Sequence, residues 1–137
     1  MSISIPESHR DLVEQPLVAT LATITPNGKP HTTVIWRYFD GTHFLFITSR
    51  HLQKAKNIEA NRDVSLLVID PHNSARYLEV RGVVEEISEA GALEQLDKMT
   101  QFYTNKSAYY GDIVPAEKKG SRTHLICRIK PTKVIAR

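Results

Sequence analysis

The sequence predicts a mainly β protein, an antiparallel β-barrel with flanking helices. Three observations point to this fold. Six short segments are rich in β-branched and aromatic residues, glycine-containing turns join the first three of them, and helices are expected in only three places. The chain of 137 residues has the length of one domain, so we expect a single domain over residues 1–137.

The composition excludes several other classes of protein. With 41% hydrophobic and 24% charged residues, the chain is neither disordered nor collagen-like nor a coiled coil. The single cysteine, Cys127, excludes a disulfide framework and a cysteine-based zinc site, and it fits a reducing compartment. No run of about 18 apolar residues is present, and residues 1–6 do not resemble a signal peptide. We therefore expect a cytoplasmic protein with no membrane partner.

The N-terminal third is expected to form a short helix and three strands. The helix covers residues 7–15, between Pro6 and Pro16. The strands cover residues 17–25, 32–39 and 43–48. Asn27–Gly28 and Asp40–Gly41 are strong turn signals, so the three strands are expected to form an antiparallel meander.

The middle of the chain is expected to form a short helix and two strands. The helix covers residues 50–61, where three apolar residues share one face: Leu52, Ala55 and Ile58. Residues 64–69 are nearly all apolar, which predicts a strand buried on both faces, whereas residues 77–87 alternate. Gly82 interrupts that alternation and indicates a bulge or the close approach of another group to the backbone.

The C-terminal third is expected to contain the longest helix and a last strand. Ser88 is the expected N-cap of a helix over residues 89–103, whose apolar positions keep the helical period. Residues 104–121 are polar and are expected to form a loop. The last strand covers residues 123–129 and is expected to end at Pro131. In this strand Cys127 alternates with isoleucines, and we interpret it as a core residue rather than a nucleophile.

Charge is unevenly distributed, although the net charge is only +3. Residues 85–97 contain acidic residues and no basic ones, whereas residues 118–137 contain basic residues and no acidic ones. A third cluster is formed by Arg50, Lys54, Lys56 and Arg62. Positive fields of this kind suit an anionic partner, although solvated surfaces have the same composition. No aromatic residues lie between the basic residues of positions 118–137, so no nucleic-acid partner is expected.

Several common reaction motifs are missing from the sequence. It contains neither of the two common glycine-rich nucleotide-binding loops and no Gly-x-Ser-x-Gly nucleophile motif. Its six histidines never fall four residues apart on an expected helix, so no metal site is expected. The sequence therefore assigns no catalytic residue.

One stretch, residues 46–58, has the pattern of an anion site. A strand ends at Thr48 and Ser49, and a helix begins shortly afterwards with Lys54 and Lys56 in its first turns. Free N–H groups at a helix start favour an anion, and hydroxyl and ammonium donors add to that preference. The pattern predicts a phosphate pocket, with a plain amphipathic helix as the alternative. The polar face of this helix is expected to carry Lys54, Asn57 and Asn61.

A series of motifs in one order along residues 10–135 resembles a known family. The matching segments are Leu17–Thr23, Asn27–His31, Val34–Trp36, Asp40–Gly41, Thr48–Arg50, Lys54–Ile58, Asn61–Asp63, Asp70–Asn73 and Arg76–Gly82. In these segments the chain resembles the FMN-binding split-barrel superfamily, that of pyridoxamine 5′-phosphate oxidase-like proteins. Within it, the chain is most similar to the short branch of coenzyme F420-dependent oxidoreductases.

The resemblance implies a split barrel and a homodimer with its cofactor site at the subunit interface. It implies an oxidoreductase that moves a hydride between a bound deazaflavin (F420) or FMN and a small organic substrate. It places three residues along the ring, four at the phosphate, and two on a strand that reaches the site from the second subunit. With Asn57, the implied cofactor-binding residues are Val34, Ile35, Trp36, Thr48, Ser49, Lys54, Lys56, Tyr77 and Arg81.

The chain also departs from the family pattern. Close relatives often carry arginine where this chain has Leu52 and Lys56, and an ammonium group cannot make a bidentate phosphate contact. The C-terminal extension of true pyridoxamine-phosphate oxidases is missing, so vitamin B6 oxidation is not expected. F420 is favoured over FMN, because its oligoglutamate tail suits a nearby basic region, for which the candidates are Lys118, Lys119 and Arg122. The alternatives are an FMN flavoprotein and a non-enzymatic cofactor or ligand carrier.

Overall fold

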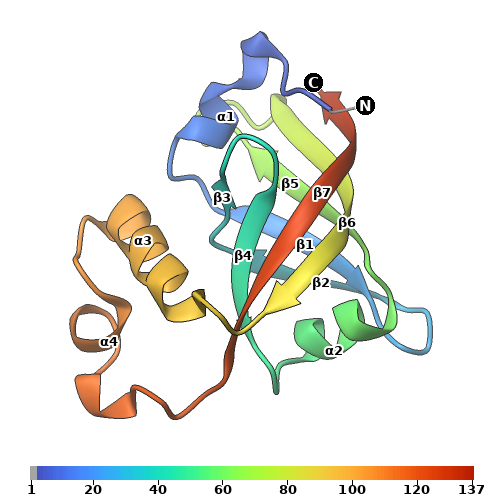
Figure 1. Ribbon diagram of the computed structural model, residues 1–137. Helices are drawn as coiled ribbons and strands as arrows, with labels where there is room; N and C mark the ends of the chain where they lie inside the picture. The colour runs from blue at the N-terminus through green and yellow to red at the C-terminus, as the bar shows by residue number, and fades with distance from the viewer. Residues whose placement is uncertain (1–2) are drawn as a thin grey trace.

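A computed structural model describes residues 3–137, which form one antiparallel seven-stranded sheet with helices at its margins (Figure 1). The strands are β1 (Ala19–Ile24), β2 (Pro30–Ile35), β3 (Tyr38–Phe39), β4 (Phe44–Ser49), β5 (Asp63–Ile69), β6 (Tyr77–Ser88) and β7 (His124–Ala136). The helices are α1 (Asp11–Glu14), α2 (Gln53–Ala60), α3 (Ala92–Thr104) and α4 (Tyr109–Asp112), with short 3-10 helices η1 (Glu7–His9) and η2 (Ala116–Lys118). No helix within residues 3–137 is both long and apolar enough to cross a membrane.

The sheet has the strand order β2-β1-β5-β6-β7-β4-β3. Its two edge strands, β2 and β3, follow each other directly in the chain, separated only by Trp36 and Arg37. The sheet therefore curls until its edges approach each other (Figure 1). This arrangement confirms the expected mainly β split barrel, with seven strands instead of six.

The expected three-stranded meander is wrong. Strands β1 and β2 form one hairpin and β3 and β4 form another, but β2 and β3 lie at opposite edges of the sheet. The chain changes direction at Arg37, whose side chain is fully buried. Its guanidinium donates hydrogen bonds of 2.8–2.9 Å to the carbonyls of Leu12, Val13 and Gln15 at the end of α1. A strand that continued through this point could not satisfy those contacts, so β2 ends at Ile35.

Strand β7 runs past the proline at which it was expected to end. Pro131 pairs with Gly82 of β6, where the register of the two strands shifts. A Cβ at Gly82 would lie 2.6 Å from both Lys130 O and Ile129 Cγ2, so only glycine fits this approach. Proline is tolerated here because a bulge does not require its missing N–H. The bulge expected at Gly82 is confirmed.

Three other expectations need correction. Ser88 remains in β6, where it pairs with Ile126, and α3 begins only after Gly91. The expected loop over residues 104–121 contains α4 and η2. Strand β5 is buried on one face only, since one side of the sheet faces the barrel interior and the other faces outwards.

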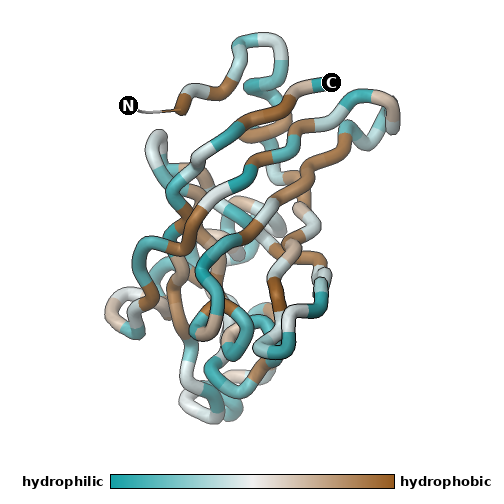
Figure 2. The backbone as a smooth tube through the Cα atoms, turned by 90° about the vertical axis from the view of Figure 1, so that its right-hand side faces the viewer, coloured by the Kyte–Doolittle hydropathy of each residue, from teal (hydrophilic) through white to brown (hydrophobic). Residues whose placement is uncertain are grey.

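Two hydrophobic clusters stabilise the fold. The larger fills the barrel interior with residues such as Phe44, Phe46 and Leu66, and the smaller packs α3 against β4 and β7. Figure 2 shows the corresponding alternation of hydrophobic and hydrophilic residues along the long strands. Cys127 is fully buried in the larger cluster, and desolvation raises the pKa of its thiol to about 12. Its assignment to the core is confirmed.

We expect Gly82→Ala to lower the free energy of unfolding by about 1–3 kcal/mol, because the added methyl group collides with the backbone of β7. Urea denaturation would measure this loss. Lys130→Ala, at an exposed position of the facing strand, is the matched control and should change stability by less than about 0.5 kcal/mol. An unchanged urea midpoint for Gly82→Ala would contradict the close packing of β6 on β7.

Candidate functional site

A cavity of about 390 Å³ lies between the two edge regions of the curled sheet. Strand β2 and the residue before β1 form one wall, β4 forms the other, α2 contributes one side chain, and α3 and α4 cover the opening. The lining residues are Val18, Val34, Ile35, Trp36, Ile47, Lys54, Leu96, Met99, Tyr109 and Ile113. Since Lys54 carries the only charge among them, the cavity offers apolar walls and a single cation.

Four of the predicted site residues line this cavity: Val34, Ile35, Trp36 and Lys54. Val34 and Ile35 are the last two residues of β2, and their side chains point to opposite faces because side chains alternate along a strand. Ile35 faces the barrel core and is 5% exposed, whereas Val34 points outwards and is 68% exposed. Val34 therefore forms an exposed apolar surface next to Trp36.

Lys54 is the one cationic side chain that lines the cavity. It lies in the first turn of α2 and is half-buried, and this burial lowers the pKa of its ammonium group. No carboxylate within residues 3–137 forms an ion pair with it. A partly desolvated ammonium without a counterion is well suited to bind an anionic group of a ligand.

The two predicted hydroxyl residues are both buried at the end of β4. Because Ile47 lines the cavity, strand alternation directs Ser49 to the same face and Thr48 to the opposite face. Thr48 Oγ1 is buried and makes no hydrogen bond within the described part of the chain. Ser49 is therefore the hydroxyl that the strand directs towards the cavity side.

The other two predicted residues of α2 do not line the cavity. Lys56 is exposed, about 200° around the helix from Lys54. Asn57 is fully buried: its amide donates to Thr23 Oγ1 at 3.0 Å and accepts from Gln53 Nε2 at 2.7 Å. The expectation that Asn57 lies on a polar face opposite the apolar residues of the helix is wrong, because these bonds hold its side chain against β1.

Tyr77 and Arg81 also lie outside the cavity of this chain. They belong to β6, which is separated from β1 by β5. The Arg81 guanidinium pairs with Glu79 at 2.9 Å, which lowers the pKa of that carboxyl. Within one chain these residues are not brought together with Lys54.

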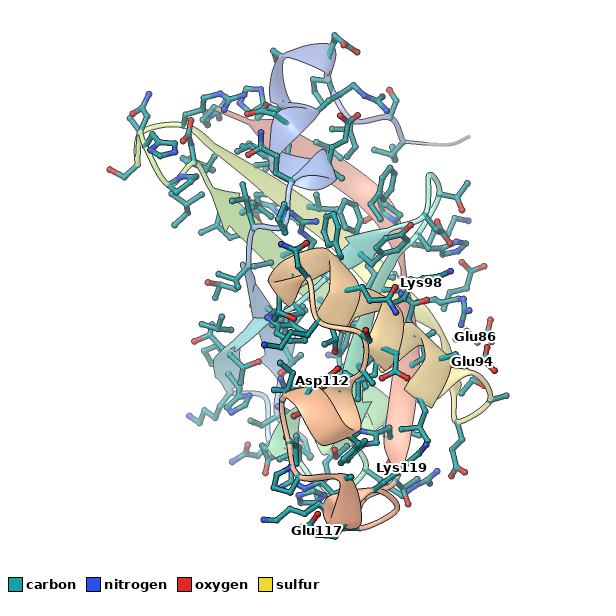
Figure 3. All side chains as sticks on the ribbon, turned by 90° about the vertical axis from the view of Figure 1, so that its left-hand side faces the viewer. Glu86, Glu94, Lys98, Asp112, Glu117 and Lys119 are labelled. Carbon is teal, nitrogen blue, oxygen red and sulfur yellow. The ribbon has the colours of Figure 1, made fainter. Side chains whose placement is uncertain are left out.

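The residues that cover the cavity were not predicted as site residues from the sequence. Leu96 and Met99 lie three residues apart on α3, so their helical spacing was a usable signal. Tyr109 and Ile113 come from a segment that was expected to be a polar loop. Figure 3 shows α3 and α4 side by side, with Glu94 and Lys98 on α3 and Asp112 on α4. No local pattern indicated that α4 folds back onto α3.

Trp36 is held in place by α3. Its ring stacks on the ring of Tyr103 with a centroid distance of 5.2 Å and an interplanar angle of 4°. The Arg37 amide donates to Tyr103 Oη at 3.0 Å, and that hydroxyl donates to the carbonyl of Arg37 at 2.7 Å or of Leu17 at 3.0 Å. Tyr103 thus fixes the point where the chain leaves β2 and orients the aromatic wall of the cavity.

Trp36 is the only tryptophan, so intrinsic fluorescence reports on this wall. We expect Tyr103→Leu to shift the emission to longer wavelength, because the indole loses its stacked neighbour and gains water. Tyr103→Phe keeps the ring and should leave the emission maximum nearly unchanged. Phe39→Leu, which changes an aromatic ring that packs on Phe44 in the other hydrophobic cluster, is the control. Identical spectra for the wild type and Tyr103→Leu would show that Tyr103 does not orient the indole.

Comparison with known proteins identifies the family. The profile of the pyridoxamine 5′-phosphate oxidase family matches residues 5–137. A pyridoxine/pyridoxamine 5′-phosphate oxidase of Rippkaea orientalis is 38% identical over 77 residues, which are 56% of this chain and 36% of the relative. The chain spans 35–47% of the length of the curated relatives that it matches.

Two solved structures are similar over nearly the whole chain. One, named F420 reductase, has a TM-score of 0.82 and 35% identity, and the match covers 96% of this chain and 98% of that one. The other, a conserved hypothetical protein of Mycobacterium tuberculosis, has a TM-score of 0.75 and 28% identity, covering 98% of this chain and 86% of that one. The chain therefore belongs to the pyridoxamine 5′-phosphate oxidase family, within the FMN-binding split-barrel superfamily.

Proposed function

We propose that this protein is an oxidoreductase that binds a flavin-type cofactor in the cavity between β2 and β4. The observation that carries the proposal is an apolar cavity with one half-buried ammonium group, Lys54, at its wall. A flat ring fits the surface formed by Val34 and Trp36, and a phosphate suits Lys54, with Ser49 on the same face of β4 as the lining residue Ile47. Membership of the family supports the same ligand class.

In this proposal the bound cofactor supplies the hydride chemistry, and the chain binds and orients it. Lys54 neutralises an anionic group, and Trp36, fixed by Tyr103, sets the plane of the ring. Leu96 and Met99 of α3 close one side of the cavity and keep water from that side.

We further propose F420 as the cofactor and a small organic molecule as the substrate. The similarity to a protein named F420 reductase, over nearly the full length of both chains, supports F420 over FMN. Titration of the purified protein with each cofactor, followed by fluorescence, tests this choice. If FMN binds more tightly than F420, the proposed cofactor is FMN. If a cofactor binds but no hydride transfer is found, the protein is better described as a cofactor carrier.

The contribution of Lys54 can be measured directly. We expect Lys54→Ala to weaken cofactor binding about thirtyfold, or about 2 kcal/mol, because a charge-assisted contact is lost. Lys56→Ala removes an equal charge from the same helix outside the cavity and should change the affinity less than twofold. Equal effects of the two substitutions, with both variants folded, would contradict the assignment of Lys54.

We also propose a homodimer whose interface is the outer face of the sheet. Three large apolar residues are exposed there, Val18 at 51%, Val34 at 68% and Ile69 at 46%. Ile69 pairs with Tyr77, so Tyr77 and Arg81 continue the same face across β6. A second copy on this face would cover the open side of the cavity and bring its own Tyr77 and Arg81 into reach.

Light scattering tests the dimer. We expect the wild type to be dimeric at micromolar concentration and Ile69→Asp to be monomeric, because a carboxylate would be buried in an apolar interface. Ile69 does not line the cavity, so the substitution leaves the cofactor contacts of one chain intact. Leu93→Asp, which changes an exposed leucine of α3, should remain dimeric. A monomeric wild type would refute the proposed interface.

A further inference from the structure

A second cavity of about 220 Å³ adjoins the first, and Tyr109 lines both. It is formed by α4, the segment around η2 and the first residue of β7. Its polar lining residues are Tyr110, Lys118, Ser121, Arg122 and His124. With Tyr109, three hydroxyl-bearing side chains and three basic side chains therefore line it, and no carboxylate does.

The segment that forms this cavity is held against α3 by hydrogen bonds. The amide of Tyr109 donates to Asp97 Oδ1 at 2.9 Å, and Gln101 Nε2 donates to the carbonyl of Ser107 at 2.9 Å. Asp112, the acidic residue of α4, accepts a hydrogen bond from the amide of Ala108 at 3.0 Å. The carboxylates of Asp97 and Asp112 thus each accept a hydrogen bond from a backbone amide of this segment.

Lys118 and Arg122, two of the basic residues that line the cavity, have no counterion within residues 3–137. Neither Lys118 nor Arg122 forms an ion pair with any carboxylate in the described range, residues 3–137. Figure 3 shows Glu117 and Lys119, their neighbours in the chain, at the end of the molecule below α4. The cavity therefore combines two unpaired cations with hydroxyl donors.

His124 gives the cavity a further donor or acceptor. Its Nε2 lies 2.6 Å from the hydroxyl of Tyr110. Burial and the nearby Arg122 lower the pKa of His124. The lowered pKa makes His124 a weaker source of positive charge than Lys118 and Arg122, the other two basic residues of the cavity.

Basic side chains also lie beyond the second cavity. Arg122 and Ser121 also line a larger, open hollow of about 510 Å³ together with Arg50 and His51. Arg50 is engaged by Glu89. A track of basic groups thus extends from Tyr109, at the wall of the first cavity, towards the end of β4.

We propose that this second cavity is an anion site that binds a carboxylate or phosphate group. The geometry favours a group carried by a molecule in or beside the first cavity, since one tyrosine separates the two spaces. That group belongs either to an anionic extension of the cofactor or to the second reactant. Only this connection to the first cavity rests on the proposed function; anion binding by Lys118 and Arg122 stands apart from it.

Titration calorimetry of the protein with inorganic phosphate and with glutarate tests the site. We expect Arg122→Ala to weaken the binding of both anions about tenfold, because the cation without a counterion is lost. Lys118→Ala should weaken it as well. Lys119→Ala removes the neighbouring cation, which does not line the cavity, and should leave the affinity unchanged. No binding at millimolar anion, or equal binding by all four proteins, would overturn the proposal.

The source of the anion is found by repeating the titrations with cofactors. If F420 binds more tightly than its form without the glutamate tail, and Arg122→Ala removes only that difference, the site holds the cofactor's extension. If glutarate still binds to the cofactor-saturated protein, the site serves the second reactant. If neither cofactor binds, but phosphate and glutarate still bind and Arg122→Ala weakens them, the proposed function is refuted and the anion site stands.

Discussion

The buried Arg37 guanidinium is the contact on which the arrangement of this protein depends. A fully buried charge is tolerated only when hydrogen bonds replace its water, and the carbonyls at the end of α1 provide them. Because this side chain is anchored at α1, the chain must turn between β2 and β3 and occupy both edges of the sheet. The turn creates the space between those edges, and Tyr103 holds Trp36 at its margin.

The resulting cavity keeps its apolar walls apart from its single charged group. Apolar residues from strands and helices form its walls, whereas Lys54 at the first turn of α2 is its only charged group. The amide of Asn57 fixes α2 on β1 one turn later, so the position of Lys54 is set by a buried hydrogen bond rather than by its own flexible chain. Additional positive charge lies in the neighbouring cavity around Arg122, outside the apolar space.

Local sequence patterns predicted most of the helices and strands, but few of the contacts between them. The turns at Gly28 and Gly41 and the bulge at Gly82 were visible because each needs a particular backbone geometry. The separation of β2 from β3 was not visible, since it depends on contacts between Arg37 and a helix more than twenty residues away. In the site, Val34, Trp36 and Lys54 could be predicted from the family resemblance. The covering residues of α4 could not, because tertiary hydrogen bonds fold that segment onto α3.

The position of the cavity between the sheet edges has a consequence for folding. The two hairpins, β1–β2 and β3–β4, close over short loops, but Phe44 of β4 pairs with Ile129 of β7 across most of the chain. Pairings of such long range are slow to form. The cavity walls meet only after this pairing has formed, so a binding-competent pocket exists only in the nearly complete fold. A ligand that binds this cavity therefore binds only the folded chain and raises the free energy of unfolding of the whole sheet.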